Sequence, residues 1–192
     1  FKDCADGTYP QGAAAYEKRG VAVYVPTWKP ENCIQCNNCA FVCPHAAIRP
    51  FAMTEEEAAA APAATKFTAK PVIKTNYKFT MAISPMDCMG CTLCVKACPV
   101  TKKVLENAAK TVAAEHPEYD PKTAAKESAK LASAKSAIEM VLQPTQLDQQ
   151  APFDNAVAHV SEKPELINAT VKGSQFKQPL LEFSGSCAGC AE

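Results

Sequence analysis

Two runs of four closely spaced cysteines constrain this chain more than any other feature of its sequence. The first run lies in CIQCNNCAFVCP, residues 33–44, and the second in CMGCTLCVKACP, residues 88–99. A shift of 55 residues, which takes Cys33 to Cys88, superposes every cysteine of the two runs and the proline that ends each run. The sequence therefore predicts two repeated units that face each other across a pseudo-twofold axis.

Each run has the spacing C-x2-C-x2-C-x3-C-P, which is typical of proteins that bind two [4Fe-4S] clusters. In this pattern three cysteines of a run bind one cluster and the fourth binds the other. The proline after the fourth cysteine disfavours helical backbone there and turns the chain away from the cluster enclosed by its own loop. Two iron-binding ligand sets follow: Cys33, Cys36, Cys39 and Cys98 for the first cluster, and Cys88, Cys91, Cys94 and Cys43 for the second.

Two other uses of cysteine fit the sequence less well. The chain has 11 cysteines, an odd number, so a fully paired disulfide scaffold is disfavoured. Zinc sites combine two separated C-x2-C pairs and do not require four sequential cysteines followed by proline. Both proposed sets already contain four sulfur ligands, so His45 is interpreted as a packing or hydrogen-bonding residue and not as a ligand.

Charge and hydropathy point to a protein in aqueous solution. The chain has 20 basic and 20 acidic residues, which gives no reason to expect a nucleic acid or an anionic membrane as partner. No apolar run approaches the roughly 18 residues of a membrane helix, and the N-terminus does not resemble a signal peptide. A cytoplasmic location is the expectation. Because the first residue is Phe1 and not methionine, we also expect the chain to be part of something longer.

The fold class expected from these patterns is α+β. Residues 21–25 and 77–83 alternate like strands, so each unit reads as a strand, a proline turn, a cysteine loop and a short turn of helix. Between the units, Thr54 and Glu57 have the spacing of a capping box and predict a short helix at 55–61, followed by a loop.

The region after the second cysteine run is expected to form a helical hairpin. Its first helix is predicted at 102–114, and Asp120 followed by Pro121 is typical of the start of the second. Leu131, Ala134, Ile138, Val141 and Leu142 share one helical face, so this second helix is expected to end before Pro144. Residues 145–186 show no clear period and are expected to form an irregular linker or the entry to another domain.

Three cysteines stand apart from the two runs. Cys187 and Cys190 form CAGC near the end of the sequence, which fits half of a zinc site, a redox dithiol or half of a third cluster, since two ligands are too few to hold a cluster. Cys4 is a single cysteine, and we assign it no role.

Long stretches of the sequence resemble the pyruvate:ferredoxin (flavodoxin) oxidoreductases, which are large homodimeric enzymes that use thiamine diphosphate. The resemblance covers KDCADGTYPQG, PENCIQCNNCAFVCPHAAIRPF, DCMGCTLCVKACP, HPEYDPKTAAKESA and LEFSGSCAGC. It implies a bacterial 2[4Fe-4S] ferredoxin-like domain with a helical extension at 21–145, carrying the medial and distal clusters. Residues 1–20 would be a connecting segment, and residues 146–192 a linker and the start of a thiamine-diphosphate-binding domain.

The resemblance also implies a function. The family decarboxylates pyruvate oxidatively with coenzyme A, and this segment would pass electrons singly to an external ferredoxin or flavodoxin. Cys187 and Cys190 would open the ligand set of a third, proximal [4Fe-4S] cluster. That cluster and thiamine diphosphate with Mg would be complete only in the full-length enzyme, so this segment would hold no catalytic residue. The alternative is a free-standing two-cluster ferredoxin, which would need neither the hairpin nor the long tail.

Overall fold

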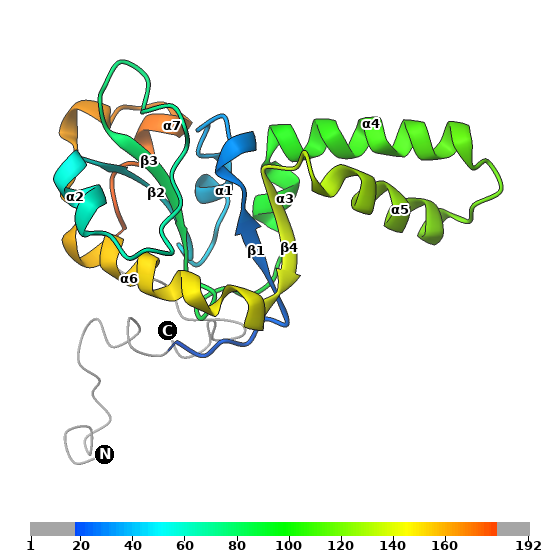
Figure 1. The fold of residues 1–192 in the computed structure, drawn as a ribbon, viewed down its shortest axis with the longest axis horizontal. Helices are drawn as coiled ribbons and strands as arrows, with labels where there is room; N and C mark the ends of the chain where they lie inside the picture. The colour runs from blue at the N-terminus through cyan, green and yellow to red at the C-terminus, as the bar shows by residue number, and fades with distance from the viewer. Residues whose placement is uncertain (1–17, 180–192) are drawn as a thin grey trace, which may run out of the picture.

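The computed structural model describes residues 18–179. Its strands form two separate two-stranded antiparallel sheets, shown in Figure 1. One sheet pairs β1 (Tyr24–Trp28) with β4 (Ile138–Leu142), and the other pairs β2 (Ile48–Met53) with β3 (Lys78–Ile83). Each sheet therefore joins a strand that precedes one cysteine loop to a strand that follows the other.

The cysteine loops lie between the strands of this arrangement. The first loop connects β1 to β2 and contains the 3-10 helix η3 (Pro30–Asn32) and the short helix α1 (Asn38–Phe41). The second loop follows β3 and contains α3 (Leu93–Ala97), which packs against α1. Trp28 and Phe79, from one strand of each sheet, meet edge to face with ring centroids 6.1 Å apart. The main core thus lies between the sheets and includes the buried Cys94 and Cys98.

The strand predicted in the second unit is confirmed, and the strand of the first unit lies a few residues later than predicted. The strand predicted at 77–83 is β3, but the strand predicted at 21–25 begins at Tyr24. Ala22 is buried, but Val21 and Val23 are 51% and 68% exposed, so the two valines upstream of β1 do not face the core. The sequence did not predict β2, because all six of its residues are buried and a strand buried on both faces shows no alternation of polar and apolar residues.

The helix predicted to continue to residue 143 is wrong beyond Ser133. The structure ends α5 (Pro121–Ser133) there and places Ile138 to Leu142 in β4, where Ile138 pairs with Trp28 and Leu142 with Tyr24. The apolar spacing that suggested one helical face is produced by the end of a helix followed by a strand. Its partner strand lies about a hundred residues earlier, so the local pattern could not reveal the pairing.

Helices α4 (Pro99–Glu115) and α5 pack against each other and project from the body of the protein in Figure 1. α4 covers the helix expected at 102–114. α5 begins as predicted, because the Asp120 carboxylate accepts hydrogen bonds from the N–H groups of Lys122 and Thr123 at 2.9 and 3.2 Å. Small buried side chains such as Ala108 and Ala132 allow the two helices to approach closely.

The capping box predicted for the short helix α2 (Glu55–Ala60) is also present. The Thr54 hydroxyl accepts from the N–H of Glu57 at 3.2 Å, and the Glu57 carboxylate accepts from the N–H of Thr54 at 2.8 Å. Glu57 also binds the buried Lys163 ammonium at 3.0 Å. Burial alone raises the pKa of this carboxyl, but hydrogen bonds from Ser161, Thr54 and Lys163 lower it to about 2. Helix α2 is therefore fixed to a segment a hundred residues later.

The expectation of an irregular linker is wrong for the part of residues 145–186 that the structure describes. This part contains η4 (Gln143–Gln149), α6 (Gln150–His159), η5 (Pro164–Leu166) and α7 (Val171–Ser174). Pro152 occupies the first turn of α6, where its missing N–H has no helical partner to lose. No helix of the described residues is long and apolar enough to span a membrane.

Helix α6 closes a second hydrophobic cluster, so its removal from the core should be costly. Phe153 is fully buried against Phe51, Met53 and Ala82. We predict that Phe153→Ala lowers the free energy of unfolding by about 3–5 kcal/mol, because it leaves a cavity in this cluster. Val157→Ala on the same helix is the control: its side chain is 41% exposed, and about 1 kcal/mol or less is expected. Urea unfolding measures both, and equal small effects would show that α6 does not contribute to the core.

Candidate metal centres

The two cysteine loops have the same backbone conformation. Gln35 and Gly90, 55 residues apart, have φ angles of +56° and +69°, and Asn37 and Thr92 have φ angles of +62° and +67°. The N–H of Gln35 donates to Cys33 Sγ at 3.3 Å, and the N–H of Gly90 donates to Cys88 Sγ at the same distance. Both loops thus curl so that backbone N–H groups face their own sulfur atoms.

Each loop borders a cavity whose lining includes four cysteines. Around the first cavity the structure places Cys33, Cys36, Cys39 and Cys98. Around the second it places Cys43, Cys88, Cys91 and Cys94. Three cysteines of each set come from one loop, and the fourth comes from the other loop. These are the two groups of four that the sequence pattern predicted.

The fourth cysteine of each run reaches the other cavity because of the backbone around its proline. Cys98 ends α3 and precedes α4, with extended backbone angles of −72° and 114°, and Pro99 starts α4. Cys94 and Cys98 are one helical turn apart, yet they line different cavities. Cys39 and Cys43, at the end of α1, are divided between the cavities in the same way. The cavities therefore lie close together, separated by α1 and α3.

The walls of both cavities are mainly apolar. Trp28, Met81 and Ile138 face the first cavity, and Ile48, Leu93 and Met140 face the second. The indole N–H of Trp28 is buried beside the Cys33 thiol and has no hydrogen-bond partner of normal geometry among the described residues. A sulfur acceptor inside the cavity would satisfy this donor. His45 also lines the second cavity, as part of its wall.

Burial makes the cysteine thiols hard to ionise. Desolvation raises the pKa of Cys88 to about 11 and that of Cys94 to about 12, and neighbouring cysteines add to the effect. It also raises the pKa of Cys39 well above the usual range. Metal ligands must be thiolates, so four such groups need cations among them to hold their charge, and metal binding releases their protons. In the described residues, no group of three or more Cys, His, Asp or Glu side chains converges to hold a metal ion. The four cysteines of each set instead line a shared cavity.

Asp87 is a residue that the sequence reasoning did not single out. Its side chain is fully buried directly before Cys88, where it binds the Lys18 ammonium at 2.7 Å and the Ser84 hydroxyl at 2.6 Å. The repeat places Asn32 at the matching position before Cys33, and its side-chain amide donates to the carbonyls of Ala134 and Ser136. Both residues hold a distant segment next to a cysteine loop. The alignment of the two cysteine runs places Asn32 and Asp87 at equivalent positions, and this equivalence was the sequence signal for their shared role.

The positive φ of Gly90 predicts a position that tolerates little change. A Cβ atom there would lie 3.0 Å from the carbonyl oxygen of Tyr24, so both conformation and space oppose a side chain. We predict that Gly90→Ala lowers the free energy of unfolding by about 1–3 kcal/mol. The control is Thr92→Gly in the same loop. Thr92 also has a positive φ angle, which glycine adopts without strain, so this change should be neutral or stabilising. Anaerobic urea unfolding of the iron-loaded protein compares them, and a harmless Gly90→Ala would contradict the loop geometry.

Comparison with known proteins agrees with this site. Residues 32–102 match the family described as 4Fe-4S dicluster domain, which covers both cysteine loops. The predicted N-terminal segment before residue 18, and the predicted half-site at Cys187 and Cys190 with the unassigned Cys4, lie outside the described residues.

Similarity to named proteins extends along the whole chain. It is 43% identical over 194 aligned residues to a pyruvate-flavodoxin oxidoreductase of Klebsiella pneumoniae, an alignment that covers 100% of this chain and 14% of that protein. It is 40% identical over 191 residues to the pyruvate:ferredoxin oxidoreductase of Moorella thermoacetica, covering 97% and 13% of the two chains. A mitochondrial pyruvate dehydrogenase [NADP(+)] of Euglena gracilis is 34% identical over 97% of this chain and 8% of its own length.

The chain therefore spans about a seventh of the length of the oxidoreductases that it matches. Its identity with them includes the α4–α5 hairpin and the segment around α6, which lie beyond the two cysteine loops. Over nearly its whole length the chain is thus similar to one segment of pyruvate-flavodoxin and pyruvate:ferredoxin oxidoreductases, and within that segment residues 32–102 match a 4Fe-4S dicluster domain.

Proposed function

We propose that the eight cysteines of the two loops hold two [4Fe-4S] clusters with exchanged fourth ligands. The observation that carries this proposal is the lining of the two cavities, each with three cysteines of one loop and one of the other. The matching backbone angles of the loops and the crossed pairing of the strands support an approximate twofold relation between the units. In this arrangement each cluster would crosslink the two halves of the domain.

We infer that the segment transfers single electrons inside a pyruvate:ferredoxin or pyruvate:flavodoxin oxidoreductase. A [4Fe-4S] cluster accepts and releases one electron at a time, whereas oxidative decarboxylation of a 2-oxoacid releases two. The chain supplies mainly apolar walls to both cavities, and it keeps the cavities adjacent through α1 and α3. Residues one turn apart on a helix have Cβ atoms only about 6 Å apart, so Cys94 and Cys98 provide a short path between the sites.

The rest of the reaction would belong to parts of the protein beyond this segment. Pyruvate and coenzyme A, thiamine diphosphate with Mg, and the second subunit of a homodimer are proposed for the full-length enzyme. Cys187 and Cys190 would contribute two ligands to a third [4Fe-4S] cluster there. The external acceptor would be a ferredoxin or a flavodoxin, as the names of the relatives suggest, and the enzyme would act in the cytoplasm.

The alternative of a free-standing two-cluster ferredoxin accounts for less of the chain. It would explain residues 32–102, but not the similarity to large oxidoreductases over the hairpin and α6. A zinc module would leave the space between the cysteines of each cavity unexplained, since zinc sites draw four ligands onto a single ion.

Metal analysis of the chain, isolated without oxygen, tests the cluster content. We expect about eight irons and eight sulfides per chain, because two four-iron clusters fit the two ligand sets. After reduction, EPR should show two interacting spins, because the cavities are adjacent. A colourless zinc-containing protein, or four irons with an isolated spin, would contradict two-cluster binding.

Exchange of the fourth ligands makes a directional prediction. Cys43→Ala should damage the cluster bound by Cys88, Cys91 and Cys94 more than the cluster of its own loop. Cys98→Ala is the matched control, since it should damage the cluster bound by Cys33, Cys36 and Cys39. EPR redox titration of the two variants distinguishes the signals. Loss confined to the variant's own loop in both cases would show that each run binds a cluster alone.

A further inference from the structure

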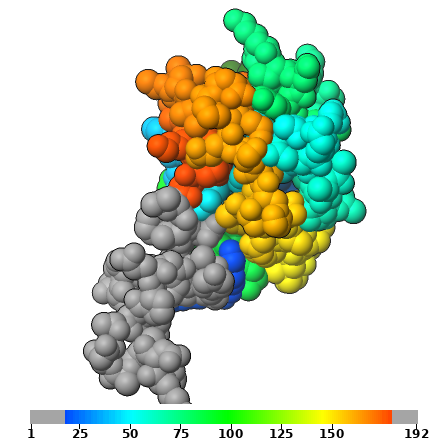
Figure 2. Space-filling model, turned by 90° about the vertical axis from the view of Figure 1, so that its left-hand side faces the viewer, coloured from blue at the N-terminus to red at the C-terminus, as the bar shows by residue number. Residues whose placement is uncertain are grey.

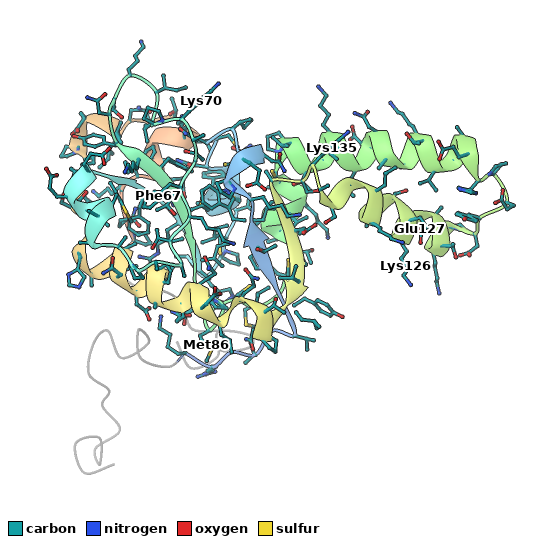
Figure 3. All side chains as sticks on the ribbon, viewed as in Figure 1. Phe67, Lys70, Met86, Lys126, Glu127 and Lys135 are labelled. Atoms are coloured by element: carbon teal, nitrogen blue, oxygen red, sulfur yellow. The ribbon has the colours of Figure 1, made fainter. Side chains whose placement is uncertain are left out.

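The segment between α2 and β3, residues 62–77, has a distinctive charge. It contains three lysines, Lys66, Lys70 and Lys74, and no acidic residue. All three lysines are exposed, and they form no ion pair within residues 18–179. Figure 3 shows Lys70 on this loop, and Figure 2 shows the loop projecting from the upper edge of the molecule. The loop thus places unneutralised positive charge on a protein with no net charge.

The loop is held in place by the first cysteine loop. The Gln35 side-chain amide donates hydrogen bonds to the Thr68 hydroxyl at 3.0 Å and to the Lys70 carbonyl at 2.9 Å. Val72 is 2% exposed and belongs to the main core, which anchors the outer part of the loop. The lysines are therefore carried by an anchored backbone, next to the residues that curl around the first cavity.

A surface groove is lined by residues of both loops. Cys33 and Ile34 line both this groove and the first cavity, so a single layer of residues lies between them. Ile34 and Ile73, which both line the groove, are 60% and 69% exposed. Glu31 is the acidic residue in the groove lining. The surface formed by Ile34, Lys66, Lys70, Ile73 and Lys74 is called the loop surface below.

The second cavity lies near both ends of the described chain. Lys18 binds Asp87, directly before Cys88, and Pro179 lines a hollow together with Cys43. Cys43 and Cys88 both line the second cavity. In Figure 1 the first described residues, in dark blue, lie at the bottom of the view, and the loop between α2 and β3 lies at the top. Lys18 and Pro179 therefore lie on the side of the second cavity, whereas the loop surface lies beside the first.

We propose that the loop surface is the docking site for a small acidic electron-transfer protein that takes electrons from the first cluster. This proposal rests on the proposed function, and it identifies the surface through which electrons would leave the segment. Complementary charge steers association, and a partner with an acidic rim around an apolar centre would match the lysines around Ile34 and Ile73. Docked there, the partner would be separated from the cluster by the Cys33–Ile34 layer alone. One electron would leave the reduced cluster and reduce the oxidised partner.

The test uses the full-length oxidoreductase with Lys66, Lys70 and Lys74 all replaced by Gln. The matched control replaces Lys122, Lys126 and Lys130 of α5, which removes the same charge from exposed positions elsewhere. The probes are a purified acidic ferredoxin and an acidic flavodoxin. We expect the loop variant to bind the oxidised probes about tenfold more weakly in calorimetry at low ionic strength, and to reduce them with a correspondingly lower kcat/KM. The difference should shrink in high salt.

Other outcomes separate the two proposals. Pyruvate and coenzyme A should still bleach the clusters of the loop variant at the wild-type rate, and iron content should be unchanged. If the wild-type enzyme reduces neither its clusters nor the probes, the proposed function fails. If it does, and the loop variant binds the probes as tightly as wild type, the docking site is wrong. A larger effect of the α5 variant would instead place docking on the hairpin, and binding unaffected by either variant would indicate that another part of the protein covers the loop surface.

Discussion

The exchange of one cysteine between two loops is the constraint on which the rest of this structure depends. A loop of the spacing C-x2-C-x2-C supplies three sulfurs, and the residue that completes each set lies in the other loop. The strands repeat this exchange, because β1 pairs with β4 and β2 pairs with β3. Cluster binding and sheet formation therefore require the same approach of the two halves, and each would stabilise the other. The α4–α5 hairpin precedes β4 and the loop of residues 62–77 precedes β3, and all four strands of the crossed pairing are present beside them.

The sequence predicted the parts of the structure that are set by local spacing. The capping box at Thr54 and the helix start at Asp120 were correct in position, and each predicted group of four cysteines lines one cavity. Each depends on residues a few positions apart or on a repeat that can be read directly. The parts that failed depend on distant partners. Ile138 to Leu142 form a strand only because β1 lies beside them, and α6 is helical where Phe153 enters a cluster made by β2 and β3.

Asp87 has a structural role that the sequence did not predict. The carboxylate has no distinctive motif, and its role appears only when Lys18 and Ser84 are seen around it. Its partner position in the repeat, Asn32, also ties the approach to a cysteine loop to a distant segment. The two loops therefore have the same cysteine spacing and matching backbone angles, and they differ in the charge of the residue that precedes the first cysteine.

The most direct test of the exchanged ligands is a crystal structure of the iron-loaded protein with anomalous diffraction recorded at the iron absorption edge. The anomalous map should show two groups of four iron atoms, one in each cavity. One group should be bonded to Cys98 and to three cysteines of the first loop, and the other to Cys43 and three cysteines of the second. Iron groups bonded to all four cysteines of a single run would contradict the account.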